Sequence, residues 1–488
     1  MMMKKLCYLI VAGLSLLQAC DKESGPVVGP PVSPDEIGKA SVWLTTGDKT
    51  KLLNKEGDIS ITEPIATTLP LITIDPAQTY QQIDGFGAAM TGSSAYLIKN
   101  LSASRRNALL QELFDPGAGI GISYVRLTIG ASDFSLEDYS YNDMPAGETD
   151  FSLQNFSLSK DADVISVMKQ VVAVNPVIHI MGSPWSAPAW MKTNGSMKYV
   201  NGQANKLKED CYEVYADYFV KYIQAYAAEG ITIETITPQN EPLHYTAGYP
   251  CMHMEAVEQI NFVKNHLGPA LQAASLNTKI IAYDHNWDNT NYAISVLNDA
   301  GAKQYVAGSA FHAYAGNVSA MTTVRNAHPD KGLYFTEVSG GEWATNFSDN
   351  LQWSMSNIFI GTTKNWSKNV LLWNMALDPN FGPKNNGCSD CRGVITIAPD
   401  GTITRNVEYY TIGHFSKFVQ TGAKRIASTI SENIANVDYV AFANTDGNLA
   451  MVVANNNDTM KTFAVKQGSG QFTYAIPAKS VVTLTWKL

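Results

Sequence analysis

Short apolar runs of the β type recur along most of the chain, and stretches with helical periodicity separate most of them. In residues 210–229, for example, Val214, Tyr218, Ile223 and Tyr226 fall roughly on one helical face. Because eight such runs alternate with helical stretches across residues 79–420, this part of the chain is predicted to form a (β/α)8 barrel. The eight runs are 82–87, 124–129, 177–182, 235–238, 279–283, 309–313, 333–336 and 369–373.

The two ends of the chain carry a different pattern. Residues 421–488 have no strong helical period and contain alternating segments that are separated by turns such as 445–448. Similar segments lie within residues 39–78. We therefore predict an α/β fold in which a TIM barrel has an appended β-sandwich side domain, and we expect the N-terminal strands to join that sandwich. The segments are 41–45, 71–74, 437–444, 449–455, 461–465 and 480–486.

The first residues are typical of an export signal. Two lysines precede the apolar run 6–17, which is too short to span a bilayer stably. The run ends in Leu17-Gln18-Ala19-Cys20, which resembles the lipobox of bacterial lipoproteins. We expect a signal peptide at 1–19, lipidation of Cys20 and a flexible tether at 20–38. This places the protein in the cell envelope, lipid-anchored at the outer membrane with surface exposure; an ordinary secretory signal is the alternative.

Composition narrows the classes of partner. Hydrophobic residues make up 45% of the chain and charged residues 16%, which suits a large core. The net charge of −9 and the lack of a basic cluster argue against nucleic-acid binding. Cys388 and Cys391 have a spacing that favours a small disulfide loop, since a zinc site would need a second ligand pair. We expect no metal and no cofactor, and a monomer.

Two glutamates stand where a barrel carries its chemistry. Active sites of such barrels collect at the carboxyl ends of the strands. Glu241 follows the fourth predicted strand in the segment 238–242, and Glu337 follows the seventh. Two carboxyl groups facing one sugar ring are what glycoside hydrolysis requires. An Asn-Glu-Pro segment by itself is a weak signal, and its position on strand four strengthens it.

Further motifs give the barrel a family resemblance. The chain resembles the clan A glycoside hydrolases, and specifically family 30, the group of glucosylceramidases and microbial endo-β-1,6-glucanases. The resemblance covers most of the predicted mature chain and is specific for the family, but much less so for the substrate. The matching segments are 82–91, 125–127, 132–135, 183–192, 240–242, 248–250, 312–314, 336–337 and 373–377.

The resemblance implies that Glu241 is the acid/base and Glu337 the nucleophile of a retaining double displacement. Retention predicts carboxyl groups about 5–5.5 Å apart. We expect Arg126 and Tyr314 to hold the pKa of Glu337 down, and the acid to keep its proton near neutrality. Asn240 is placed to bond the 2-hydroxyl of the sugar.

Other positions are assigned to the substrate. Trp373 is expected to form the floor under the sugar that is cleaved, and Asp133 and Trp185 to hold its hydroxyl groups. The full substrate-binding set is Arg126, Asp133, Trp185, Asn240, His312, Tyr314 and Trp373. Candidate outer subsites are His244, Tyr245, Asp284, His285, Trp287 and Trp343.

An endo-β-1,6-glucanase acting on an oligo- or polysaccharide of the pustulan type is the favoured function. The strand-four loop offers His244, Tyr245 and Thr246, whereas a ceramide substrate would favour an apolar collar. The alternatives are a glucosylceramidase-like exo-β-glucosidase and another family-30 specificity, for xylan or β-1,6-galactan. A surface glycan-binding lipoprotein without catalysis is a further alternative, against which the presence of both glutamates argues.

Overall fold

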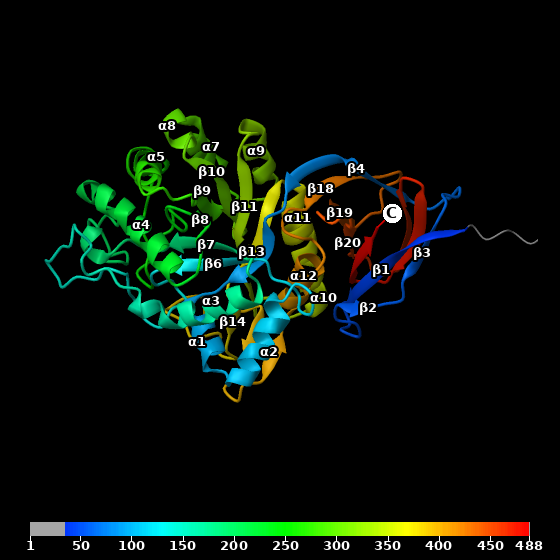
Figure 1. The fold of residues 1–488 in the computed structure, drawn as a ribbon, viewed down its shortest axis with the longest axis horizontal. Coiled ribbons are helices and arrows are strands. Elements are labelled where there is room, and N and C mark those ends of the chain that lie inside the picture. The colour runs from blue at the N-terminus through cyan, green and yellow to red at the C-terminus, as the bar shows by residue number, and fades with distance from the viewer. Residues whose placement is uncertain (1–34, 488) are drawn as a thin grey trace, which may run out of the picture. The chain divides into compact units, whose positions relative to one another are not determined.

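A computed structural model describes residues 35–487, and eight of its strands close into a parallel barrel (Figure 1). The neighbours around the ring are β10-β11-β13-β5-β6-β7-β8-β9, so the predicted barrel is present. The strands are β5 (Gly85–Ala89), β6 (Tyr124–Ile129), β7 (His179–Pro184), β8 (Thr235–Ile236), β9 (Lys279–Asn286), β10 (Val306–His312), β11 (Gly332–Glu337) and β13 (Ser367–Leu372). Several are buried along their whole length, as strands covered on both faces are.

Helices follow the barrel strands and bury one face against them. Helix α4 (Tyr212–Ala228) corresponds to the helix predicted over 210–229. The four residues predicted to share one face are all buried: Val214, Tyr218, Ile223 and Tyr226. The helices are α1 (Gly92–Asn100), α2 (Ala103–Phe114), α3 (Ala162–Val174), α4, α5 (Ala256–Phe262), α6 (Gly268–Ala273), α7 (Thr290–Asn298), α8 (Ala300–Lys303), α9 (Ser319–Ala327), α10 (Phe347–Trp353), α11 (Ile360–Lys364) and α12 (Val407–Ser416). Short π-helical turns, Val263–Leu267 and Ser354–Phe359, join α5 to α6 and α10 to α11.

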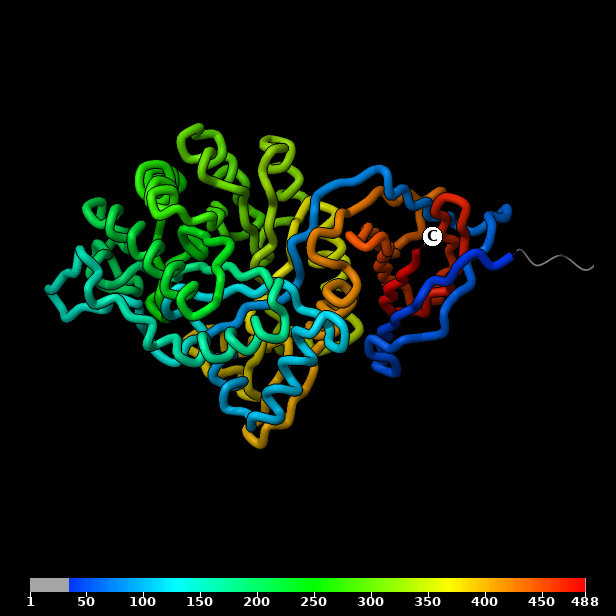
Figure 2. Tube along the Cα trace, viewed as in Figure 1, coloured from blue at the N-terminus to red at the C-terminus, as the bar shows by residue number. Residues whose placement is uncertain are grey.

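The strands of the second large sheet come from both ends of the chain and form the side domain. Their sheet has the order β2-β1-β23-β20-β19-β18-β4-β21-β22-β3, and β3 also pairs with β1, so the sheet folds back around its own apolar core. In Figure 2 the blue N-terminal and red C-terminal segments accordingly lie side by side. The strands are β1 (Glu36–Thr46), β2 (Asn54–Lys55), β3 (Ile59–Thr62), β4 (Leu71–Gln82), β18 (Lys424–Ile430), β19 (Val437–Ala443), β20 (Leu449–Asn455), β21 (Lys461–Gln467), β22 (Gly470–Ile476) and β23 (Ser480–Trp486).

Small sheets complete the mouth of the barrel. The strands β12 (Gly340–Gly341) and β15 (Cys391–Arg392) pair with each other. A second small sheet contains β14 (Ala376–Leu377), β16 (Ile395–Ile397) and β17 (Ile403–Arg405). Cys388 and Cys391 form a disulfide, as their spacing favoured.

The predicted signal peptide 1–19 and the lipidation site Cys20 lie outside the described residues, as does the tether up to residue 34. The tether was predicted to reach residue 38, but β1 begins at Glu36, where pairing with Thr62 of β3 gives the backbone an ordered partner. Within residues 35–487, no helix has both the length and the apolar character needed to cross a membrane.

Helix α12 connects the barrel to the side domain through His414. All of its residues are buried, and Ile412 and Phe415 belong to the barrel core. His414 contacts the hydroxyl of Thr45 on β1 and that of Thr483 on β23, each at 2.8 Å. Because burial lowers the pKa of His414 to about 3, this imidazole is neutral in the folded protein.

The buried imidazole makes stability depend on pH. An unfolded histidine binds a proton below about pH 6.5, whereas folded His414 does not. The free energy of unfolding should therefore fall as the pH is lowered from 6.5 towards 3, by up to about 1.4 kcal/mol per pH unit from this group. His414→Gln should flatten this slope in urea denaturation at pH 4.5, 5.5 and 7. The same substitution at half-buried His253 serves as the control, and an unchanged slope in His414→Gln would contradict the prediction.

Candidate active site

Glu241 and Glu337 meet at the carboxyl ends of the barrel strands. Glu337 ends β11, and Glu241 follows β8 with a left-handed backbone (φ 43°). Oxygen atoms of the two carboxyl groups lie within 4.8 Å of each other, and the side chains remain 15% and 7% exposed. This gap is of the order found in retaining glycosidases and leaves no room for the water that an inverting enzyme places between its carboxyl groups.

Arg126 lies under this pair and is completely buried. It forms an ion pair with Glu337 through Nη1, and its Nη2 donates to Asn240 Oδ1 at 2.7 Å. Tyr314 donates its hydroxyl to Glu337 Oε1 at 3.0 Å. The two residues predicted to contact the nucleophile therefore do so, and together they fix both oxygen atoms of its carboxylate.

Asp284 was predicted at an outer subsite, but it is completely buried beneath the catalytic pair. The reason is a bulge in β9: Ala310 of β10 faces Tyr283 and Phe311 faces His285, so Asp284 is an extra residue with a left-handed backbone (φ 65°). Asp284 accepts hydrogen bonds from four donors besides His312. These are Arg126 Nη2 (2.9 Å), Ser183 Oγ (2.7 Å), Thr237 Oγ1 (2.8 Å) and Thr336 Oγ1 (2.7 Å).

His312 links Asp284 to Glu241. Its Nε2 lies 3.0 Å from Asp284 Oδ1 and its Nδ1 lies 2.9 Å from Glu241 Oε1. Burial lowers the pKa of His312, but the charge of Glu337 and the hydrogen bonds to Asp284 and Glu241 outweigh burial and raise the pKa to about 9. Burial raises the pKa of Glu241, but the bond and charge of His312 bring it down to about 2. Glu241 and His312 therefore hold one proton between them, and near neutrality it lies on His312. The expectation that Glu241 itself keeps its proton is wrong, because the sequence does not show the bond from His312.

The pKa of Glu337 differs from the sequence-based expectation. Burial raises it above the usual value, and the neighbouring Glu241 carboxylate adds to this effect. The charges of His312 and Arg126 oppose the rise without cancelling it. The lowered pKa that we predicted is thus wrong for this site, because the sequence names the cation beside Glu337 but not the depth at which the pair is buried.

Two tryptophans and an aspartate form one wall of the site. Trp185 and Trp373 stack with ring centroids 5.0 Å apart, and the Arg126 guanidinium lies 5.0 Å and 5.4 Å from their centroids. Burial raises the pKa of Asp133 well above its usual range. Its Oδ1 is buried and finds no hydrogen-bond partner among the described residues, so this oxygen is left to bond a sugar hydroxyl.

The remaining outer-subsite candidates are divided by the structure. Trp287 is buried against Phe335 in the barrel core, so it does not form part of an outer subsite as predicted. His285 lies 4.0 Å from Glu241 and belongs to the catalytic centre. Tyr245 and Trp343 are 49% and 58% exposed. His244 lies 3.0 Å from the hydroxyl of Tyr249 through its Nε2.

Some residues around the site were missed in the sequence. Ser183, Thr237 and Thr336 hold Asp284, and each lies at a predicted strand end, which is the signal that could have found them. The atoms of Glu241, His312 and Glu337 also lie close enough to share a metal ion. Ion pairs and hydrogen bonds within the described residues already account for this trio, and Arg126 supplies the positive charge beside Glu337.

Comparison with known proteins identifies the family. The model of the glycosyl hydrolase family 30 TIM-barrel domain matches residues 83–419. The chain belongs to glycosyl hydrolase family 30. The model of the family 30 β-sandwich domain matches residues 422–484 of this family-30 hydrolase. As the family hydrolyses glycans, the substrate is a carbohydrate and the protein is an enzyme.

The relatives of this family-30 hydrolase include proteins named for two different activities. An endo-1,6-β-D-glucanase of Neurospora crassa is 38% identical over 81% of this chain and 84% of its own. The lysosomal acid glucosylceramidase of Mus musculus is 30% identical over 86% of this chain and 83% of its own. The solved structure of an endo-β1,6-glucanase superposes with a TM-score of 0.86 at 38% identity, covering 92% of this chain and 99% of the other.

Proposed function

We propose that this family-30 hydrolase is a retaining endo-β-1,6-glucanase. The observation that carries the reaction type is the gap of less than 4.8 Å between the oxygen atoms of Glu241 and Glu337. The linkage is supported by the 38% identity to chains named as endo-β-1,6-glucanases, against 30% for the glucosylceramidase.

In the first step Glu337 attacks the anomeric carbon while the bond from that carbon to the leaving oxygen breaks. Glu241 passes to this oxygen the proton that it shares with His312. Arg126 and Tyr314 hold the attacking carboxylate in one orientation, so that little reorganisation is needed as its charge is lost. The product of this step is a glucosyl ester of Glu337 with inverted configuration.

In the second step water attacks the same carbon and Glu241 takes its proton, which releases Glu337 and restores the configuration. Formation of the ester has by then removed the charge of Glu337. Since that charge is the strongest interaction raising the pKa of His312, the Glu241–His312 pair holds its proton less tightly in the intermediate. The pair can therefore serve as acid first and as base afterwards.

Digestion of defined glycans tests the proposal. The protein should release a ladder of gentio-oligosaccharides from pustulan, a linear β-1,6-glucan, and should leave β-1,3-glucan, glucuronoxylan and glucosylceramide micelles largely intact. Glucose as the sole early product would indicate exo action, and cleavage of glucosylceramide alone would indicate the glucosylceramidase function. Proton NMR of the first products should show the β-anomer, whereas the α-anomer would contradict retention.

Asp284→Asn tests the role of the buried carboxylate. Because Asp284 raises the pKa of His312, its loss should move the basic limb of the kcat/KM profile to lower pH. We also expect kcat to fall by roughly 10²-fold, because the substitution disturbs the position of Arg126. Thr336→Val removes one hydrogen bond but keeps the charge, so its basic limb should stay in place. A basic limb that does not move in Asp284→Asn would refute this role.

We further propose that Cys20 is lipidated and that the enzyme is anchored in the cell envelope at the outer membrane. The support is the lipobox-like segment 17–20 in the sequence. Cys20→Ala should move the protein from the membrane fraction to the soluble fraction, and unchanged fractionation would contradict the anchor.

A further inference from the structure

A cavity of about 500 Å³ opens beside the nucleophile. Tyr314, Val338 and Ser339 line its inner end. Tyr314 reaches Glu337 Oε1 with its hydroxyl, and Val338 and Ser339 are the next two residues after Glu337. The cavity therefore lies next to the catalytic centre, with Tyr314 between them, and its volume is within the range of small-ligand pockets.

Two tryptophans form the outer walls of this cavity. Trp343 is 58% exposed and Trp353 is 47% exposed, which is unusual for side chains of this size. A Cβ atom at Gly341 would collide with the Trp343 ring, so one face of the indole lies against the Gly341 backbone. The opposite face is left free to stack on the C–H groups of a sugar ring.

Polar side chains complement the two rings. Ser339, Asp349 and Asn350 line the same cavity and offer a hydroxyl, a carboxylate and an amide oxygen. The hydroxyl of Ser339 has no partner among the described residues, whereas the amide nitrogen of Asn350 already donates to the carbonyls of Ala344 and Asn346. An aromatic platform beside a few hydrogen-bonding groups suits a sugar, which has an apolar face and a rim of hydroxyls. A lipid chain would leave these polar groups without partners.

The loop that carries Trp343 is held in place from below. Its strand β12 pairs with β15, in which Arg392 follows the disulfide-bonded Cys391. Arg392 Nη1 donates to the carbonyl oxygens of Gly341 (2.9 Å) and Ala344 (3.0 Å), while Nη2 binds buried Glu408 at 2.9 Å. Trp343 is thus presented by an anchored loop, which reduces the entropy lost when a ligand binds.

The cavity lies at the carboxyl ends of β10 and β11. Tyr314 and Trp343 follow β10 and β11, and His312, which shares the proton of Glu241, ends β10. Asp133 follows β6 and Trp185 follows β7. These two strands lie on the opposite side of the barrel from β10 and β11. If these two hold the sugar that becomes bound to Glu337, the leaving sugar lies towards the cavity.

We propose that this cavity is a subsite for glucosyl residues on the leaving-group side, with Trp343 and Trp353 as its stacking walls. The inference rests on the proposed function, since it deepens the substrate binding of the same site. If the subsite exists, sugars on the leaving-group side of the scissile bond should raise kcat/KM, and this gain should require Trp343.

The test compares two substrates in Trp343→Ala. Pustulan fills the leaving-group side with sugar, whereas 2,4-dinitrophenyl β-glucoside leaves it without sugar and requires no proton from Glu241. We expect kcat/KM on pustulan to fall about tenfold or more, and kcat/KM on the aryl glucoside to change by less than about twofold. Trp353→Ala should act in the same direction, and Trp343→Phe should restore most of the loss because a ring remains.

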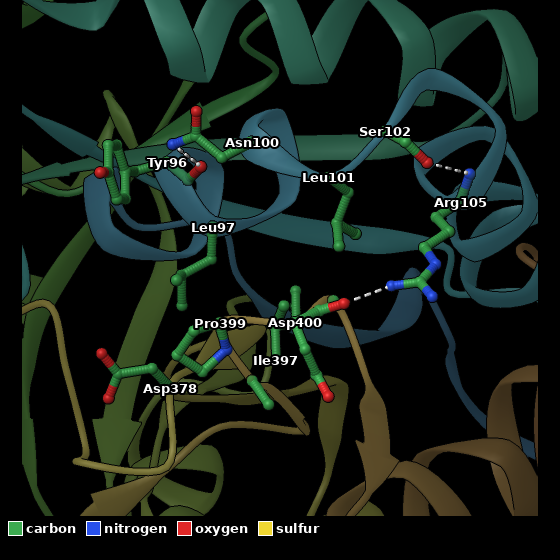
Figure 3. A pocket seen from close by; sticks show the side chains of 12 residues that line it. Tyr96, Leu97, Asn100, Leu101, Ser102, Arg105, Asp378, Ile397, Pro399 and Asp400 are labelled. Carbon is green, nitrogen blue, oxygen red and sulfur yellow. Dashed lines mark hydrogen bonds between the residues drawn. The ribbon is translucent and has the colours of Figure 1, made fainter.

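A second cavity supplies the matched control. It measures about 510 Å³, and exposed Tyr96 lines it together with Arg105 and Asp400 (Figure 3). Tyr96 lies on α1, so Tyr96→Ala removes an exposed aromatic ring from a cavity away from the active site, and both activities should remain at the wild-type level.

The outcomes separate the two proposals. A wild-type enzyme that hydrolyses the aryl glucoside but not pustulan would overturn the proposed glucanase function, and with it this subsite for β-1,6-glucan. A wild-type enzyme that cleaves pustulan, with Trp343→Ala and Trp353→Ala equally active on it, would overturn the subsite alone. Equal losses on both substrates would also overturn it, because they would indicate damage to the catalytic centre.

Discussion

Glu337→Gly should lose more than about 10⁴-fold of the turnover on pustulan and on 2,4-dinitrophenyl β-glucoside, because both require the covalent step. Added azide should then restore hydrolysis of the aryl glucoside, since the small anion can enter the space of the missing carboxylate and attack the anomeric carbon. A single displacement inverts the configuration, so the product should be the α-glucosyl azide. Proton NMR of the azide adduct provides the measurement.

Glu234→Gln is the matched control for this variant. Glu234 precedes β8 and forms an ion pair with His179 at the start of β7, at the end of the strands opposite to the catalytic pair. Its loss should leave both activities close to wild type. A β-configured azide from Glu337→Gly, or substantial turnover without azide, would assign the nucleophile elsewhere.

Glu241→Ala should show a loss that depends on the leaving group. On pustulan the leaving sugar oxygen needs protonation, so kcat/KM should fall by about 10²–10⁴-fold. Dinitrophenolate leaves without a proton, so formation of the glucosyl enzyme from the aryl glucoside should be slowed far less. Azide should accelerate release of the sugar from Glu337 and give the β-glucosyl azide, because two displacements restore the configuration.

The azide products expected from the two variants are opposite anomers. They therefore distinguish the roles of the two glutamates whatever the size of the loss in turnover. Equal losses of Glu241→Ala on pustulan and on the aryl glucoside would argue that Glu241 only positions other groups. A burst of dinitrophenolate from Glu241→Ala, followed by slow turnover, would show that hydrolysis of the glucosyl enzyme is the slow step because it lacks its general base.

The alternation of apolar runs and helical faces made the barrel predictable. The prediction for β6 matches Tyr124–Ile129, because all six residues are buried and Gly130, with a left-handed backbone, ends the apolar run. The side-domain strand β22 was missed because Gly470–Ile476 begins with Gly-Gln and follows a short turn at Gly468, so the polar residues masked the alternation. Strand β18 begins Lys424-Arg425, which hid its apolar positions in the same way.

At the site, motif and strand position predicted Glu241, Glu337, Arg126 and Tyr314, but the arrangement of Asp284 could not be predicted. Its burial follows from one extra residue in β9, and a bulge depends on the pairing with β10 rather than on the local sequence. The protonation of the pair was also out of reach, because it depends on how far His312 lies from three carboxylates at once.

The pairing of β1 with β23 has a consequence for biosynthesis. Ala40 lies opposite Trp486, so 446 residues separate the two partners along the chain. At a translation rate of about 5–20 residues per second, β1 leaves the ribosome roughly 20–90 s before its partner exists. During this interval the first strands present an open edge, and only completion of the last segment of the polypeptide lets the side domain close. A nascent chain of this enzyme is therefore exposed to aggregation at its beginning until its end has been made.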